Sequence, residues 1–194
     1  MAGGFAVAVG DSQPLPEPAH AVPAALLVDD DALVKQCRVD AYRGSGPGGQ
    51  KRNKTSNAIR LTHAPTGAVA SAADDRSTRV NRLHAARRLR VRIAAEVRTP
   101  IALDPHVPYV PPVWLAPYVR DGRLRINPSN ALRPAAAAVA LDLLLASHGD
   151  PTLAALNLGV SLRSYLALLH AESAWAEAAN ALRTRFSLGP LQSH

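Results

Sequence analysis

Apolar and polar residues alternate with a period of two around residue 40. Val39, Ala41 and Arg43 alternate with Arg38, Asp40 and Tyr42, which predicts a strand. Residues 58–63 have strand character, residues 68–71 can return as a partner strand, and Ala64-Pro65-Thr66-Gly67 between them is a turn. We expect a β-hairpin there. Three successive aspartates, 29–31, are placed to cap a short helix that runs to about Gln36.

From Arg76 to Arg98 the spacing of apolar residues becomes helical. Those near one face are Val80, Leu83, Ala86, Ile93 and Val97. Most of the arginines fall on the other faces. At ~1.5 Å per residue the helix would be roughly 34 Å long. We expect its apolar stripe to cover the sheet, and its arginines to be free for bidentate bonds to phosphates.

Proline and glycine divide the rest of the chain. Residues 99–119 contain six prolines, which predicts a linker, and we expect its Tyr109, Trp114 and Tyr118 to pack against a neighbouring element. An Ala/Leu-rich helical region follows. Its predicted helices begin at Pro134, at Asp150-Pro151, at Ser161 and at about Glu172, with Gly149 and Gly159 ending the first two.

These elements predict an α+β fold, in which a small β-sheet and one long basic helix precede an all-α C-terminal appendage. We place the boundaries of the parts as follows: an irregular, proline-rich tail over 1–25, an α+β domain over 26–98, a linker over 99–119 and a helical domain over 120–194.

The composition favours an intracellular globular protein. About 47% of the 194 residues are hydrophobic, which is enough for a folded core. Cys37 is the one cysteine, so the chain cannot build a disulfide framework. No apolar run reaches the ~18 residues that span a bilayer, and residues 1–20 lack the positive start of a signal peptide. We expect a cytoplasmic location.

Positive charge is concentrated in one part of the chain. Residues 35–98 hold fifteen of the 22 Lys and Arg residues and four acids, a net charge of +11, whereas the remainder carries −4. A basic module joined to a mildly acidic remainder predicts a polyanion as the partner of that module alone. A solvated arginine-rich face is the simpler alternative.

The stretch 43–50, Arg-Gly-Ser-Gly-Pro-Gly-Gly-Gln, cannot form regular secondary structure, because it combines four glycines with a proline. It is predicted to be a loop. Gln50 is followed at once by Lys51, Arg52 and Lys54. A backbone rich in N–H donors beside these cations suits phosphate groups.

The motif SGPGGQ at 45–50 and the surrounding residues resemble the catalytic domain of peptide chain release factors and ribosome-rescue hydrolases. The resemblance covers roughly residues 37–95. It rests also on Asn53, Thr55, AIRLTHAPTG at 58–67, Asp75-Arg76-Ser77 and Asn81-Arg82. The sequence departs from the family at Thr78, which usually is Gln, and at Arg52, which usually is a small apolar residue.

The resemblance implies hydrolysis of the ester that joins a nascent peptide to tRNA, without a cofactor or metal. It implies that Gly48, Gly49 and Gln50 are catalytic and that Ser45, Gly46 and Pro47 shape the loop. Residues that would contact RNA are Arg43, Lys51, Arg52, Lys54, Arg76, Arg79, Arg82, Arg87, Arg88 and Arg90. The implied partners are the ribosome, through its large-subunit rRNA, and the P-site peptidyl-tRNA.

We expect release without codon reading, because only about 36 residues precede the resemblance. Two alternatives stay open. One is a ribosome- or rRNA-binding protein without release activity. The other is a DNA-binding regulator, because Ala155, Gly159, Val160, Tyr165 and Leu168 have the spacing of a helix-turn-helix unit. A small helical bundle that only packs would show the same spacing.

Overall fold

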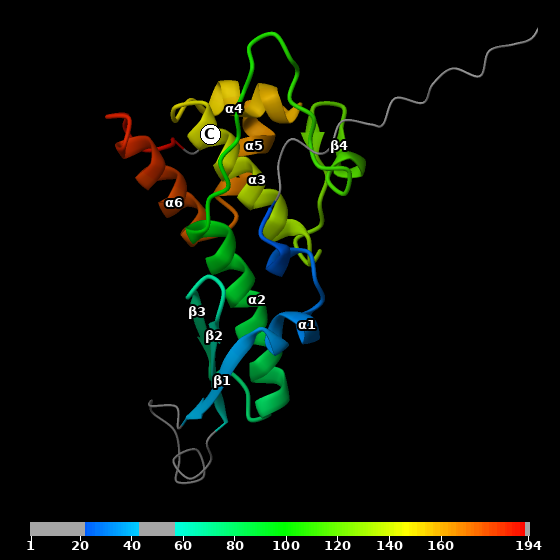
Figure 1. Ribbon diagram of the computed structural model, residues 1–194, viewed down its shortest axis with the longest axis vertical. Coiled ribbons are helices and arrows are strands. Elements are labelled where there is room, and N and C mark those ends of the chain that lie inside the picture. The colour runs from blue at the N-terminus through cyan, green and yellow to red at the C-terminus, as the bar shows by residue number, and fades with distance from the viewer. Residues whose placement is uncertain (1–21, 43–56, 193–194) are drawn as a thin grey trace, which may run out of the picture.

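The computed structural model describes residues 22–42 and 57–192. Figure 1 shows an elongated molecule with a small sheet at one end and a group of helices at the other. The strands are β1 (Cys37–Tyr42), β2 (Ala58–His63), β3 (Val69–Ala72), β4 (Val119–Arg120) and β5 (Arg123–Leu124). The α-helices are α1 (Asp30–Lys35), α2 (Thr78–Glu96), α3 (Arg133–Ala146), α4 (Pro151–Leu158), α5 (Leu162–Leu169) and α6 (Ser173–Thr184). Two 3₁₀ turns, η1 (Ala24–Leu26) and η3 (Ala116–Tyr118), complete the order. The predicted α+β class is confirmed.

Strands β1, β2 and β3 form an antiparallel sheet in sequence order. The β2–β3 hairpin turns at Gly67, whose φ of 71° favours glycine. Side chains alternate across β2, so that Ile59 and Leu61 are buried while Arg60 is exposed. Helix α2 covers the buried face of the sheet. The strands and the turn lie where the alternation of the sequence predicts them.

Each predicted start of α1, α4 and α5 has a capping side chain. Asp29 accepts a hydrogen bond from the Ala32 N–H at 2.7 Å, and Asp150 accepts one from Thr152 at the same distance. Ser161 accepts one from Ser164. Such bonds satisfy backbone donors that have no partner within the helix. The helix starts predicted at Asp29, Asp150 and Ser161 are therefore confirmed.

Helix α2 is buried along one continuous stripe. The buried residues follow one another in steps of four and form two adjacent rows, Asn81, Ala85, Leu89 and Ile93, and Ala86, Arg90 and Ala94. Leu83, which was predicted to face the core, is 38% exposed because it falls outside these rows. Besides the sheet, α2 contacts η1, α1, α3 and α6.

The predicted boundaries of the parts stay predictions, but apolar contacts cross them. One continuous cluster of buried residues runs from Val22 to Leu191. Val22 and Ala25, at the end of the predicted tail, are buried in it, so the chain is already packed from residue 22. As predicted, Tyr109, Trp114 and Tyr118 of the linker pack against the core.

Two polar contacts fasten the second half of α2, and Arg98 just beyond it, to the helical region. The Trp175 indole N–H donates to the carbonyl of Val91 at 3.1 Å. Arg98 lies 3.0 Å from the carboxylate of Asp142, which is fully buried. A guanidinium and a carboxylate that are removed from water together must keep their pairing. The far end of α2 is therefore held at a fixed place in the helical region.

Within the described residues, no single helix is both long and apolar enough to cross a membrane. Only together do helices α4 and α5 have the length and composition of a membrane-spanning segment, and they are bent by 103° at their junction.

Candidate functional site

Strands β1 and β2 hold the two ends of the predicted catalytic loop. Tyr42, the last residue of β1, pairs with Ala58, the first residue of β2, so the chain leaves the sheet and returns to it at one place. The loop residues Ser45, Gly46, Pro47, Gly48, Gly49 and Gln50, with Arg43, Lys51, Arg52 and Lys54, lie outside the described residues. Their roles stay predictions. The residues that frame the loop are described in full.

A buried amide, Asn81, connects the end of this loop to the start of α2. Its Nδ2 donates to the carbonyls of Asn57 and Asp75, each at 2.8 Å, and its Oδ1 accepts from the Asp75 N–H at 2.9 Å. Asn57 also donates to the Asp75 carbonyl at 3.1 Å. Asn81 is completely buried. An amide with two donors and one acceptor thereby satisfies three backbone groups and fixes the position of the loop's exit.

The sequence reading assigned no role to Asn81. The signal was present, because Asn81 lies on the helical face that contains Ala85 and Leu89, where an apolar residue is expected. Asp75 adds to the same arrangement by accepting the Ser77 N–H at 2.7 Å, and Ser77 in turn caps α2. A polar residue at an apolar position of the helix is thus the signal in the sequence that indicates this network.

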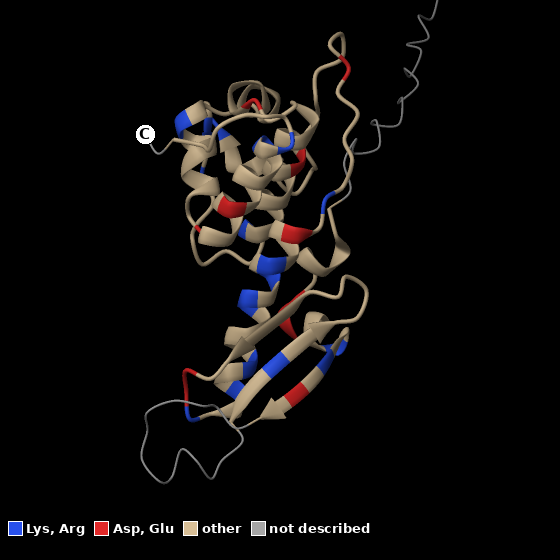
Figure 2. Ribbon diagram, turned by 90° about the vertical axis from the view of Figure 1, so that its left-hand side faces the viewer, with Lys and Arg blue, Asp and Glu red and all other residues tan. Residues whose placement is uncertain are grey.

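Four of the predicted RNA contacts lie together on the first half of α2 or just before it. Arg76, Arg79, Arg82 and Arg87 are exposed, and none has a hydrogen bond or ion pair to another described residue. Figure 2 shows basic positions along α2 and on the strands beside it. Because Asn81 joins this half of α2 to the loop's exit, these cations lie at the loop end of the molecule. Their arrangement suits a phosphate backbone.

Arg90 was predicted to contact RNA, and that prediction is wrong. It is 2% exposed. Its Nε donates to the Asp30 carboxylate at 3.0 Å, and Nη2 donates to the Val28 carbonyl at 2.6 Å. Its Nη1 donates to the carbonyls of Ala25 and Leu26. The guanidinium uses four of its five N–H donors to fasten residues 25–30 to α2, and its burial keeps it away from a phosphate.

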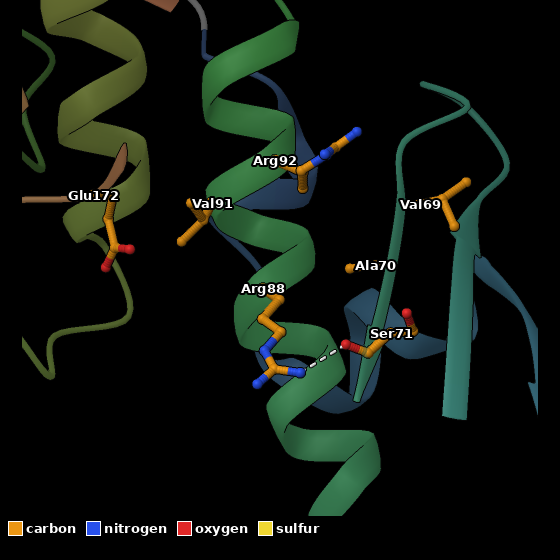
Figure 3. A pocket seen from close by; sticks show the side chains of 7 residues that line it. All are labelled: Val69, Ala70, Ser71, Arg88, Val91, Arg92 and Glu172. Atoms are coloured by element: carbon orange, nitrogen blue, oxygen red, sulfur yellow. Dashed lines mark hydrogen bonds between the residues drawn. The ribbon is translucent and has the colours of Figure 1, made fainter. Parts of the chain in front are cut away.

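Arg88 is also engaged within the domain. Its Nη1 donates to the Ser71 carbonyl on β3 at 2.8 Å, and its Nη2 lies 2.8 Å from the Asp74 carboxylate. Figure 3 shows the side chain turned toward β3, beside a cavity of about 360 Å³ that Glu172 also lines. The hydrogen bond from Arg88 lowers the pKa of Asp74. Arg88 is therefore a weaker candidate for RNA contact than the four free arginines.

His63 has a structural role. It is 1% exposed and lies at the end of β2. Its Nδ1 is 2.7 Å from Thr66 Oγ1, and its Nε2 is 3.1 Å from Gln36 Oε1. Since the amide oxygen can only accept, Nε2 carries the proton. Burial lowers the pKa of this imidazole, which keeps it neutral.

The residues that frame the loop belong to a segment with known relatives. Residues 31–102 match the profile of the RF-1 domain. Over 72 residues, the chain is 51% identical to peptide chain release factor 1 of Limosilactobacillus reuteri, which is 37% of this chain and 20% of the relative. It is 52% identical to peptide chain release factor 1 of Lactobacillus delbrueckii over 66 residues, which are 34% of this chain and 18% of the relative. It is 47% identical to that of Streptomyces griseus over 73 residues, which are 38% of this chain and 20% of the relative. No solved structure matches.

Residues 31–102 therefore form a domain of the release-factor catalytic family. The match spans about a fifth of the length of these curated relatives. These relatives are peptide chain release factors.

Proposed function

We propose that this protein hydrolyses the ester of peptidyl-tRNA on the ribosome without reading a codon. One observation carries the proposal: within the segment that matches the RF-1 domain, the sequence Gly48-Gly49-Gln50 falls between two strands whose paired ends frame it. The ester is cleaved by water. The water loses a proton as it adds to the carbonyl carbon, and the departing ribose oxygen gains one.

The proposed catalytic groups act on the tetrahedral oxyanion of this step. The main-chain N–H of Gln50 donates to the oxyanion, and its side chain positions the water. Gly48 and Gly49 give the loop a backbone conformation that residues with a Cβ rarely adopt. One such donor is worth about 3 kcal/mol. The rigid frame matters because a shift of about 1 Å at a catalytic group can cost roughly a hundredfold in rate.

Arginines on α2 and in the loop support the proposed contact with ribosomal RNA and tRNA. We assign phosphate contacts to Arg76, Arg79, Arg82 and Arg87 of the described residues, and to Arg43, Lys51, Arg52 and Lys54 of the loop. Cations that replace condensed counterions make binding steeply dependent on salt. On this proposal the protein works in the cytoplasm, where it meets ribosomes.

Codon independence is a separate part of the proposal and has a test of its own. In this chain, helices α3 and α6 pack against α2. The test compares peptide release from purified ribosomes with a stop codon, a sense codon or no mRNA in the decoding site. We expect similar rates on all three, and release confined to the stop codon would contradict codon independence.

The chemical proposal is tested with two loop variants on the same ribosomes. Gly49→Ala is expected to slow release at least about a hundredfold, because the added Cβ displaces the oxyanion donor. Gln50→Ala keeps the main-chain N–H, so its defect should be smaller, and it should admit nucleophiles larger than water. Ribosome binding should stay within a few-fold for both.

Matched controls are Gly189→Ala, where a Cβ meets nothing within 4 Å, and Gln192→Ala at an exposed position. Both should release peptide at the wild-type rate. If Gly49→Ala does so as well, the loop is not catalytic, and the protein binds RNA without releasing peptide.

A further inference from the structure

A second cluster of arginines lies on the helical region, away from the catalytic loop. Arg123, Arg125 and Arg163 line one cavity of about 620 Å³, together with Ser161 and Ser164. Figure 1 shows β4 in the upper part of the molecule, and the ends of β1 and β2 that frame the loop in the lower part. The two basic regions therefore lie at opposite ends of the long axis.

The hairpin β4–β5 places its arginines outward. It turns at Asp121 and Gly122, whose φ values of 52° and 66° suit a two-residue turn of type I′. Val119 pairs with Leu124, and both pack against the core. Because side chains alternate along a strand, Arg120 and Arg123 project from the opposite face.

Two hydrogen bonds tie this hairpin to the start of α5. The Ser161 N–H donates to the Gly122 carbonyl at 2.7 Å, and the Leu124 N–H donates to Ser164 Oγ at 2.9 Å. Arg163 lies between these two serines in sequence. The arginines of two elements are thus brought to one cavity by backbone contacts and not by their own side chains, which remain available to a ligand.

The charges of this cluster are not balanced within the described residues. Arg120 and Arg123 are direct cross-strand partners, and like charges at such a pair destabilise a hairpin. Neither they nor Arg163 has a hydrogen bond or ion pair to another described side chain. Arg125 pairs with Asp121, but these side chains are 58% and 80% exposed, and such pairs contribute little. An external anion would remove the repulsion.

We propose that Arg120, Arg123, Arg125 and Arg163, which we call the hairpin surface, bind the phosphodiester backbone of RNA. Guanidinium groups match phosphate oxygens in a bidentate manner. Exposed Ala167 and the serines of α5 offer no amide for a base edge, so contact with the backbone is favoured over sequence reading.

The choice of RNA rests on the proposed function, since the other basic region would meet ribosomal RNA. Two separate contacts on one large RNA raise the overall affinity above that of either contact alone.

The test measures binding to purified large ribosomal subunits and to a labelled 20-base-pair RNA duplex, each over a range of salt. The double variant Arg123→Gln/Arg163→Gln should bind the duplex about tenfold more weakly at moderate salt. Its slope of log affinity against log salt should fall by roughly 2, about one for each lost phosphate contact. Arg185→Gln removes an exposed arginine just after α6 and is the control for the loss of positive charge elsewhere on the molecule.

Three results would overturn the inference. Affinity and salt slope of the double variant could equal those of the control, a DNA duplex of the same length could bind tenfold more tightly than the RNA, or polyglutamate could compete as well as RNA does. Peptide release at saturating protein is measured in parallel. A wild-type protein that binds RNA but releases no peptide would contradict the proposed function. A double variant that binds RNA like the control, together with normal release by the wild type, would contradict only the hairpin surface.

Discussion

At the scale of single residues, Asn81 does the work of several backbone contacts. It satisfies the carbonyls of Asn57 and Asp75 and the N–H of Asp75 in a place closed to water. Buried backbone groups that lose their partner cost free energy, because water cannot replace the lost bond. The side chain therefore contributes both to stability and to the position of the loop's exit.

Asn81→Ala is expected to lower the free energy of unfolding by roughly 2 to 3 kcal/mol, since it leaves buried backbone groups without partners. Urea unfolding measures this change. The control is Asn157→Ala, which removes one exposed bond to the Leu153 carbonyl and should cost at most about 0.5 kcal/mol. Equal losses for the two variants would show that the network does not stabilise the domain.

Contacts between residues close in sequence could be predicted, whereas contacts between distant residues could not. Caps such as Asp29, Asp150 and Ser161 act within three residues along the chain, so the sequence alone identified them. Arg90 could not be placed in this way, because its carboxylate partner Asp30 is sixty positions away. An analysis of charge along the sequence predicts that Arg90 and Asp30 are both exposed to solvent. Only the packing of residues 25–30 against α2 brings them together and buries Arg90.

At the scale of elements, the two halves of α2 have different roles. Its first half presents free arginines beside the loop, and its second half is an internal element of the fold. The hydrophobic pattern predicted the helix and its approximate ends. It did not predict that Asn81 and Arg90 are buried, because their partners Asn57 and Asp30 lie in distant parts of the sequence.

Arg87 and Arg90 should therefore respond in opposite ways to the same substitution. Arg90→Gln is expected to cost roughly 2 to 3 kcal/mol of unfolding free energy, because it leaves the Asp30 carboxylate, whose side chain is 33% exposed, without its partner. Arg87→Gln should change stability by less than about 0.5 kcal/mol, yet it should lower the salt slope of ribosome binding by about 1.

Chemical denaturation and salt-dependent ribosome binding, applied to both proteins, test this contrast. The assignment of the two halves of α2 fails if Arg90→Gln unfolds like the wild type and weakens binding as much as Arg87→Gln.

At the scale of the whole molecule, the described residues share one apolar core. Buried residues from η1, the sheet, α2 and the later helices are continuous. Between α2 and η3, the chain passes through an exposed stretch, residues 104–108, that contributes no buried residue to this core. A cut there would break the chain without removing the contacts that join α2 to α3 and α6.

We expect limited proteolysis to cut within 104–108 first, since exposed loops are the preferred sites of cleavage. The two pieces should stay together on gel filtration, because Arg98, Asp142 and Trp175 still join them. Adding moderate urea should separate them. Pieces that separate without denaturant would show instead that residues 26–98 and 120–194 are independent domains.

The anchoring of α2 at one end has a mechanical consequence at the other. From its junction with Asp142 to its cap at Ser77, the helix spans roughly 30 Å at about 1.5 Å per residue. It behaves as a lever: tilting the anchored end by about 3° moves the free end by roughly 1.5 Å, which is the scale of error that catalytic geometry does not tolerate. A displacement of the distant helices would thereby shift Asn57, where the chain returns from the loop.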